Sequence, residues 1–251
     1  MPNFKLDLIL RKSVVEKTGE IARNARAKEF SNIMLKKVKI SVLMAVYNTD
    51  FTVIKRAIDS VLNQDYKEFE LIIIDDGSTN NNREALIRYI VAHEDRISYI
   101  RHSNRGQSES INRGVLNSVG TYITILDSDD EYKTNHLSSC LLEMASADLI
   151  CSTSETVVSS QEDYFVPDKN DLSKQIHLDE ATLFGTLFGL KEVFLTLGFK
   201  GGFAADTDFF ERAKARYRVK KVDLRTYIYY RNNPNSTCSQ VKLQNLIPVG
   251  L

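Results

Sequence analysis

The chain has 251 residues, which is enough for one large domain or for one domain with an added terminal segment. Its formal net charge is zero, so nothing global in the composition favours nucleic-acid binding. Cys140, Cys151 and Cys238 lie far apart without a C-x-x-C pair, which argues against a zinc site or a disulfide framework and fits a reducing cytoplasm.

The first 38 residues differ in composition from the rest. Together with Lys39 they hold ten basic residues against four acidic ones, and apolar residues recur near one helical face. This pattern predicts a basic amphipathic extension of one or two helices over residues 1–38. Two interpretations stay open: the extension packs on the domain or on a second subunit, or it binds an anionic membrane surface.

From Lys39 onward the sequence alternates between strand and helix patterns. We expect strands at 40–46, 69–74, 97–101 and 121–126, and helices at 51–62, 83–92 and 108–118. Repeated strand–helix units with short connections predict an α/β fold, in which helices cover both faces of a parallel sheet.

Polar residues stand at the ends of three of these strands, in the segments Tyr47-Asn48, Asp75–Ser78 and Asp127–Asp130. Ligands of such sheets bind beyond the carboxyl ends of the strands, so the three segments predict one shared pocket. In the last segment (the D-x-D-D segment, Asp127–Asp130), three carboxylates follow a strand abruptly. Clustered acids repel each other, and oxygen ligands without Cys or His favour Mg²⁺ or Mn²⁺, which commonly bind diphosphates. A polar turn is the simpler alternative.

The pattern after Asp130 is less regular. We expect helices at 135–144, 191–197 and 206–216, strands at 147–151, 219–222 and 227–230, and an irregular polar segment at 152–179.

Four segments together carry a family resemblance. They are Lys39–Asn48 (KISVLMAVYN), Leu71–Thr79 (LIIIDDGST), Asp127–Asp130 (DSDD) and Gly198–Ala213 (GFKGGFAADTDFFERA). In this order they resemble the family 2 glycosyltransferases over roughly residues 39–236. The resemblance implies a GT-A fold, a UDP-sugar donor, Mn²⁺ or Mg²⁺, and transfer with inversion at the anomeric carbon. The domain boundaries that follow are 1–38 for the helical extension, 39–236 for the GT-A domain and 237–251 for a C-terminal tail.

The resemblance also implies roles for individual residues. Ala45 and Tyr47 match the positions that line the nucleobase, with Tyr47 stacking on it, and Asp76 matches the carboxylate that reads the uracil edge. Asp75 beside it can be structural instead, as a helix cap. Asp127, Ser128 and Asp129 match the part of the D-x-D motif near the ribose and the sugar, and Asp129 or Asp130 would contact the metal.

Asp206 matches the family's general base, which takes the proton of the attacking hydroxyl. Its alternative is a plain N-cap, and Asp208 is the second candidate for the base. Arg231 would contact the donor phosphates, or it is a solvated surface arginine. The chain departs from the family pattern at three places, since Ala205 replaces the acid before the base, Ile111 stands where an arginine is common, and residues 229–236 lack the usual histidine.

The expected function is that of a hexosyl- or N-acetylhexosaminyl-transferase. It would add sugar to a glycan or a lipid-linked saccharide in bacterial surface polysaccharide biosynthesis, such as that of capsule or O-antigen. We expect a cytoplasmic protein, with residues 1–38 as a peripheral contact to the inner face of the membrane, and whether it forms a homo-oligomer stays open. The alternative from another class is a non-catalytic subunit that binds sugar nucleotide or glycan beside an active transferase, an idea motivated by Ala205 and Ile111.

Overall fold

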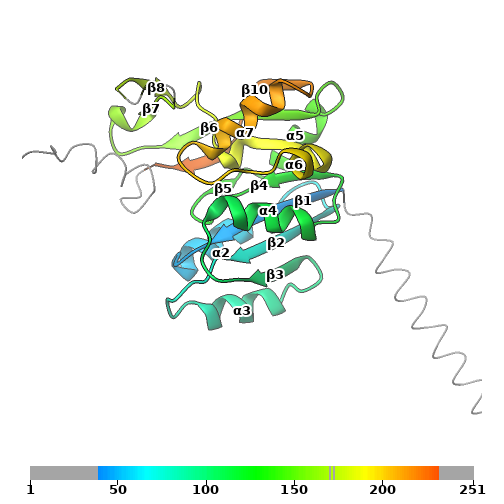
Figure 1. Cartoon of the computed structure of the whole chain (residues 1–251). Coiled ribbons are helices and arrows are strands. Elements are labelled where there is room, and N and C mark those ends of the chain that lie inside the picture. Colours follow the sequence, from blue (N-terminus) through cyan, green and yellow to red (C-terminus); the bar gives the residue numbers. More distant parts are fainter. Residues whose placement is uncertain (1–38, 170, 172, 232–251) are drawn as a thin grey trace, which may run out of the picture. The chain divides into compact units, whose positions relative to one another are not determined.

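The computed structural model describes residues 39–169, 171 and 173–231. The predicted extension at 1–38 and the tail at 237–251 therefore lie outside the described residues. Figure 1 shows the described part as a mixed sheet between helices. The strands are β1 (Ile40–Val46), β2 (Phe69–Asp75), β3 (Ile97–Arg101), β4 (Tyr122–Ile125), β5 (Glu131–Tyr132), β6 (Leu149–Val157), β7 (Phe165–Pro167), β8 (Gln175–His177), β9 (Leu187–Leu190) and β10 (Val219–Tyr230). The helices are α2 (Phe51–Leu62), α3 (Arg83–Val91), α4 (Gln107–Asn117), α5 (His136–Glu143), α6 (Lys191–Leu197) and α7 (Ala205–Lys214).

Eight of these strands form one sheet, in the order β3-β2-β1-β4-β9-β6-β10-β5. The neighbours from β3 to β4 run parallel, as predicted, and β6 and β10 are parallel to each other. Strand β9 runs antiparallel to both β4 and β6, and β5 runs antiparallel to β10. The α/β fold with a mostly parallel sheet is confirmed, with antiparallel insertions after the D-x-D-D segment.

Both faces of the sheet are covered by helices. One core contains the apolar sides of α2, α3 and α5, including Ile58, Leu86 and Leu137. The other contains α4, α6 and α7, including Ile111 and Phe209. In Figure 1, α4 lies in front of the sheet and α2 behind it. The central strands therefore have no solvent-facing side, which explains why 71–74 is a continuous apolar run.

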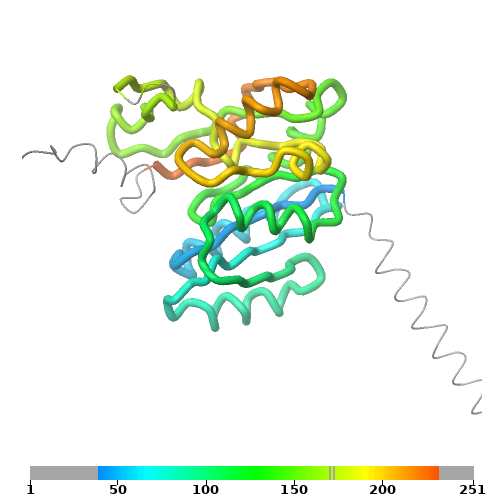
Figure 2. Tube along the Cα trace, in the orientation of Figure 1, coloured from blue at the N-terminus to red at the C-terminus, as the bar shows by residue number. Residues whose placement is uncertain are grey.

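Two predictions of irregular or broken structure are wrong. Strand β6 continues to Val157, and the segment 152–179 also contains the β7–β8 hairpin. Residues 219–230 form a single strand rather than two, and Figure 2 shows this strand running alongside β6. Four residues of β10, 223–226, lie opposite the single residue Thr153 of β6, and Arg225 within this bulge has a φ of 48°.

Candidate functional site

The sheet brings the ends of β1, β2 and β4 to one edge, because β1 pairs in parallel with both neighbours. The β1 end is tied to the loop after β2 through Asn48. Its side-chain oxygen accepts hydrogen bonds from the backbone N–H groups of Thr79 at 2.7 Å and Asn80 at 3.1 Å, and its own N–H donates to Ser78 Oγ at 3.0 Å. Tyr47 beside it is 51% exposed, so its ring is accessible to a ligand.

Asp75 organises this edge from beneath. Its carboxylate accepts hydrogen bonds from the Tyr99 hydroxyl at 2.5 Å, from Arg101 Nη1 at 2.6 Å and from the Ser78 N–H at 2.7 Å. Burial opposes the ionisation of Asp75, but these donors and the Arg101 charge outweigh it and lower the pKa. Asp75 thus has a structural role, but it holds the loop after β2 and does not cap the next helix, since the N-cap position of α3 is Asn82.

Asp76 is buried and holds the loop before α4. One carboxylate oxygen accepts from the Arg105 N–H at 2.7 Å and the other from the Gly106 N–H at 2.9 Å, and His102 Nδ1 lies 3.4 Å away. A carboxylate oxygen has more than one lone pair, so these bonds leave acceptor capacity. Recognition of a uracil edge by Asp76 stays a prediction.

The D-x-D-D segment joins three parts of the chain. Asp127 accepts from Gln107 Nε2 at 2.6 Å, and the Tyr227 hydroxyl lies 3.3 Å from its other oxygen. Asp130 is fully enclosed and accepts from the Tyr227 hydroxyl at 2.5 Å and from the Tyr230 N–H at 2.8 Å. Both Asp130 oxygens therefore have protein donors, which gives this residue an anchoring position beneath the edge, whereas Asp127 and Asp129 are only partly buried.

Negative charge is concentrated at this edge. Burial and the neighbouring charge of Asp129 raise the pKa of Asp127 to about 7, and the charge of Asp206 adds to the effect. Burial, together with the charges of Asp127 and Asp129, raises the pKa of Asp130. Carboxylates that resist ionisation in each other's presence form a place where a cation is stabilised.

Asp206 enters the same edge from another part of the chain. It lies in the first turn of α7, after Ala204, which adopts a left-handed conformation with φ of 55°. Its side chain is partly exposed, so a substrate can reach it, while the protein packed around it raises its pKa to about 6. Asp208, the second candidate for the base, is instead bonded to Arg212 Nε at 2.7 Å, and its pKa is lowered.

The donor set suits a hard cation that brings other ligands with it. Within the described residues, no group of three or more His, Cys, Asp or Glu side chains converges as a ready metal site. Mg²⁺ and similar ions commonly use one or two carboxylates together with substrate phosphates and water. The oxygens of Asp127 and Asp129 fit that requirement, because burial and then the charge of Asp129 raise the pKa of Asp127, and a cation would favour the ionised form.

Arg231 follows Tyr230 at the end of β10 and is 4% exposed. Its backbone N–H donates to the Val157 carbonyl at 2.9 Å, but its side-chain Nε and Nη1 are buried without a hydrogen-bond partner among the described residues. A buried guanidinium without acceptors is costly, and an anionic ligand is the usual acceptor for it. This observation favours the phosphate-binding interpretation over a solvated arginine.

The remaining predicted residues are placed nearby. Ser128 is buried and shares a 2.8 Å hydrogen bond with the Thr49 hydroxyl, and Ala45 is half-buried at the end of β1. Sequence reasoning missed Gln107 and Tyr227, whose side chains orient Asp127 and Asp130. Neither residue is marked by a local pattern, since Gln107 is 20 positions and Tyr227 is 100 positions from Asp127.

Comparison with known proteins defines the class. The model of the family described as Glycosyl transferase family 2 matches residues 41–204, which is more than half of the chain. The chain therefore belongs to glycosyl transferase family 2.

Three curated relatives are similar to parts of this chain. An uncharacterized glycosyltransferase of Nostoc sp. is 34% identical over 113 residues, which are 45% of this chain and 35% of that protein. The putative colanic acid biosynthesis glycosyl transferase WcaA of Escherichia coli is 44% identical over 101 residues, 39% of this chain and 35% of WcaA. An uncharacterized glycosyltransferase of Rickettsia felis is 42% identical over 109 residues, 42% of this chain and 18% of that protein. The chain thus spans about a third or less of these relatives' lengths.

Two solved structures share the fold. TarS of S. aureus in complex with UDP-GlcNAc has a TM-score of 0.63 and 19% identity, with 80% of this chain and 60% of that chain covered. The mannosyltransferase PcManGT from Pyrobaculum calidifontis in complex with GDP-Man and Mn²⁺ has a TM-score of 0.63 and 17% identity, with 82% and 60% covered. The expected GT-A fold is confirmed.

Proposed function

We propose that this glycosyltransferase transfers a hexosyl or N-acetylhexosaminyl group from a UDP-sugar, with Mn²⁺ or Mg²⁺, to a hydroxyl of a glycan or lipid-linked saccharide. The observation that carries the proposal is the concentration of carboxylates at one sheet edge, where the pKa values of Asp127 and Asp206 are raised to about 7 and about 6. Three chain segments converge there without serving the hydrophobic core, as expected for a binding site rather than a structural feature.

The donor would lie across the ends of β1 and β4. The exposed ring of Tyr47 is available for stacking on the uracil, beside Ala45, and Asp76 lies at the end of the next strand. Asp129, with Asp127 beside it, would hold the cation, while Asp130 supports the segment through Tyr227. When bound, a divalent cation stabilises the negative charge that develops on the diphosphate leaving group. Arg231, whose Nε and Nη1 lack a hydrogen-bond partner in the described part of the chain, would contact the same phosphates.

Asp206 is the proposed general base. The acceptor oxygen attacks the anomeric carbon on the face opposite to the diphosphate, its proton passes to Asp206, and the sugar–phosphate bond breaks with inversion. A pKa of about 6 leaves Asp206 mostly ionised at neutral pH and still basic enough to take a proton. Ala205 beside it points to a site with a single acid at this position.

Similar proteins support the donor and metal classes. The structural neighbours carry sugar nucleotides, UDP-GlcNAc in TarS and GDP-Man with Mn²⁺ in PcManGT. The name of WcaA refers to colanic acid biosynthesis, which supports a surface polysaccharide as the product here.

The domain boundaries and the cellular place belong to the same proposal. We infer a GT-A domain at 39–236, flanked by the 1–38 extension and the 237–251 tail, in a cytoplasmic protein that contacts the inner membrane face through residues 1–38. No helix of the described residues has the length and apolarity needed to span a bilayer.

A hydrolysis assay tests the function without the natural acceptor. UDP release is measured from a panel of UDP-sugars with Mn²⁺, for the wild type, Asp129→Ala and Asp206→Asn. We expect one donor to be hydrolysed, Asp129→Ala to abolish this, and Asp206→Asn to retain UDP binding while losing transfer. If the wild type binds UDP but hydrolyses no donor and glycosylates no acceptor, the non-catalytic subunit is the better description. If it binds no UDP with Mn²⁺, the proposal fails.

A further inference from the structure

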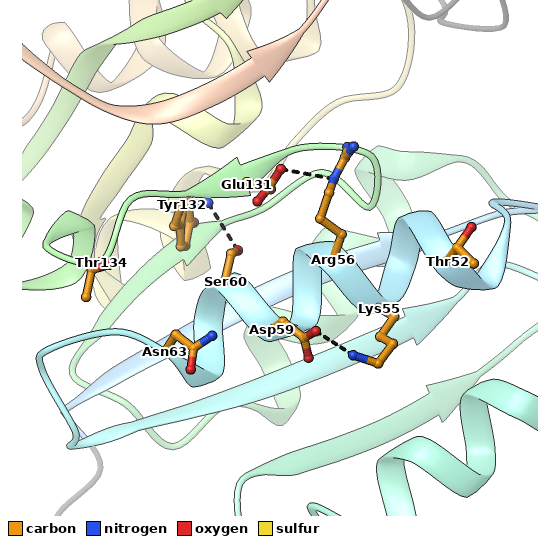
Figure 3. Close-up of a pocket in the computed structure, with 9 residues that line it drawn as sticks. All are labelled: Thr52, Lys55, Arg56, Asp59, Ser60, Asn63, Glu131, Tyr132 and Thr134. Carbon is orange, nitrogen blue, oxygen red and sulfur yellow. Dashed lines mark hydrogen bonds and ion pairs between the residues drawn. The ribbon is translucent and has the colours of Figure 1, made fainter.

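One helix outside the strand-end pocket makes direct contact with the D-x-D-D segment. Arg56 of α2 donates a hydrogen bond from Nη2 to the backbone carbonyl of Asp129 at 2.6 Å. Its Nε lies 3.0 Å from Glu131 Oε1, and its guanidinium lies over the ring of Tyr230, 4.0 Å from the ring centroid. Figure 3 shows the side chain extending from α2 toward Glu131. A single side chain of α2 therefore contacts the D-x-D-D segment, β5 and β10.

Tyr230 closes this arrangement. Its hydroxyl donates to Glu131 Oε1 at 2.6 Å, and its backbone N–H donates to Asp130 Oδ1 at 2.8 Å. We refer to Arg56, Glu131 and Tyr230 as the Arg56 clamp. The residue after Tyr230 is Arg231, the proposed phosphate ligand. The clamp therefore holds the backbone of Asp129 and also the residue next to Arg231.

We infer that Arg56 is a positioning residue for the donor–metal site: it sets the direction of the Asp129 carboxylate and its spacing from Arg231. This inference rests on the proposed function. The carbonyl of Asp129 and its side chain belong to the same residue, so a hydrogen bond that holds the peptide plane also restricts the direction in which the Cα–Cβ bond carries the carboxylate. Within the D-x-D-D segment itself, the turn is closed by one backbone bond, from the Asp130 N–H to the Asp127 carbonyl at 3.1 Å.

Arginine is the residue type that this position requires. A guanidinium is planar, donates in its plane from several N–H groups and stacks on an aromatic ring through its face. Arg56 uses these properties together, with Asp129 and Glu131 near its edge and Tyr230 at its face. The ammonium of a lysine would not combine the stacking with both the hydrogen bond to Asp129 and the ion pair with Glu131, so Arg56→Lys should not restore the wild-type site.

The same helix supplies a matched control. Arg56 and Lys55 line a hollow of about 370 Å³ between α2 and the segment from Glu131 to Thr134, shown in Figure 3. Lys55 pairs with Asp59 at 2.6 Å and lies 5.0 Å from the centroid of the Tyr89 ring. These contacts lie within α2 and α3, so Lys55→Gln removes a neighbouring cation without altering the clamp.

The test measures Mn²⁺ affinity directly, by electron paramagnetic resonance titration of free Mn²⁺ in the presence of saturating UDP. The proteins are the full-length wild type, Arg56→Gln, Arg56→Lys and Lys55→Gln. Removing a group that orients a metal ligand typically lowers metal affinity by about 10–100-fold. We expect a loss of about tenfold or more for Arg56→Gln, a smaller loss for Arg56→Lys, and wild-type affinity for Lys55→Gln.

A second readout separates positioning from damage to the fold. Binding of UDP with the metal chelated should be the same in Arg56→Gln and the wild type, and excess Mn²⁺ should restore UDP binding to the variant. If Arg56→Gln does not fold, Tyr230→Phe replaces it, because it removes only the bond to Glu131, and we then expect a several-fold loss of Mn²⁺ affinity.

Unchanged Mn²⁺ affinity in the folded Arg56→Gln protein, or in Tyr230→Phe if that variant is used, would overturn the inference while leaving the proposed function intact. If the wild type itself binds neither UDP nor Mn²⁺, the proposed function fails, and the inference fails with it.

Discussion

Tyr227 donates a hydrogen bond from its hydroxyl to Asp130 at 2.5 Å, across 97 positions of sequence, and so connects β10 with the D-x-D-D segment. Both residues are buried, and Asp127 lies 3.3 Å from the same hydroxyl. The phenol thus supports the two outer carboxylates of the segment from below, while Asp129 remains on the partly exposed side.

We expect Tyr227→Phe to lower the free energy of unfolding by about 1–3 kcal/mol, because Asp130 loses a donor in a buried place. Urea denaturation monitored by circular dichroism measures this loss. Tyr66→Phe is the control, since the Tyr66 hydroxyl donates to Glu68 near the surface, and its loss should cost less than about 0.5 kcal/mol. Equal losses in the two variants would show that the buried Tyr227 hydrogen bond contributes no more to the free energy of unfolding than the exposed Tyr66 bond.

Gly185 leaves room for the Tyr227 ring. A Cβ built at Gly185 overlaps the ring and hydroxyl of Tyr227, whereas a Cβ at Gly201 meets nothing within 4 Å. We therefore expect Gly185→Ala to lower the free energy of unfolding by about 1–3 kcal/mol through overpacking, and to weaken UDP–Mn²⁺ binding as Tyr227 moves. Gly201→Ala should leave both quantities near the wild-type values. Thermal denaturation and calorimetry with UDP and Mn²⁺ check the pair, and a stable, tightly binding Gly185→Ala protein would contradict the packing described here.

The stability of the protein should fall in acid partly because of His136. This imidazole is buried, stacks on Tyr132 with ring centroids 3.8 Å apart and pairs with the Thr226 hydroxyl at 2.8 Å. Burial lowers its pKa from 6.5 to about 3. Below pH 6.5 the unfolded state binds a proton that the folded state excludes, so the contribution of a neutral His136 is lost as the pH falls from 6.5 toward 3, by up to about 1.4 kcal/mol per pH unit.

Comparison with His136→Gln isolates this effect. The raised pKa values of Asp127 and Asp206 act in the opposite sense, because the folded state then binds protons more readily than the unfolded state. These carboxyl groups are the same in both proteins, so the difference in unfolding free energy should move in favour of the variant as the pH falls below 6.5. Parallel curves from urea denaturation between pH 5 and 8 would rule out a buried neutral His136.

Binding of UDP with Mn²⁺ should strengthen as the pH rises from 6 to 8. Asp127, with its pKa raised to about 7, must ionise when a cation binds beside it, so binding releases a proton. We expect affinity to rise by up to about tenfold per pH unit below 7, as measured by calorimetry in buffers of different ionisation enthalpy. Asp127→Asn is the control, because it removes this proton while leaving the ionisation of UDP itself unchanged. A pH dependence that is identical in the two proteins would contradict the role of Asp127.

The first half of the fold could be predicted because its elements are local. Strands β1, β2 and β4 are mostly apolar, and each helix between the first four strands has an apolar face, so periodicity places their ends within a few residues. The second half contains antiparallel insertions and a hairpin whose pairing is non-local. The polar segment at 152–179 hides the end of β6 because that strand becomes exposed there, and its residues then lose the apolar pattern.

The site shows the same division. Asp76 and Asp127 stand out in the sequence because a resemblance and a strand end both mark them, and Asp206 stands out through the resemblance alone. Tyr227 and Arg56 could not, because each acts on the D-x-D-D segment through contacts between distant parts of the chain. A tyrosine in a strand and an arginine on a helix are ordinary residues until the sheet order is known.

The bulge in β10 has an evolutionary consequence. The strand is aligned with β6 before Val222 and again from Tyr227, so the number of residues between these two points determines which side chains of the final stretch point toward Asp130. A deletion or insertion of one residue would turn Tyr227 to the opposite face of the sheet, because side chains alternate along a strand. Homologues that keep this chemistry should therefore vary freely in the identity of exposed residues such as Asp223, but not in the length of the bulge.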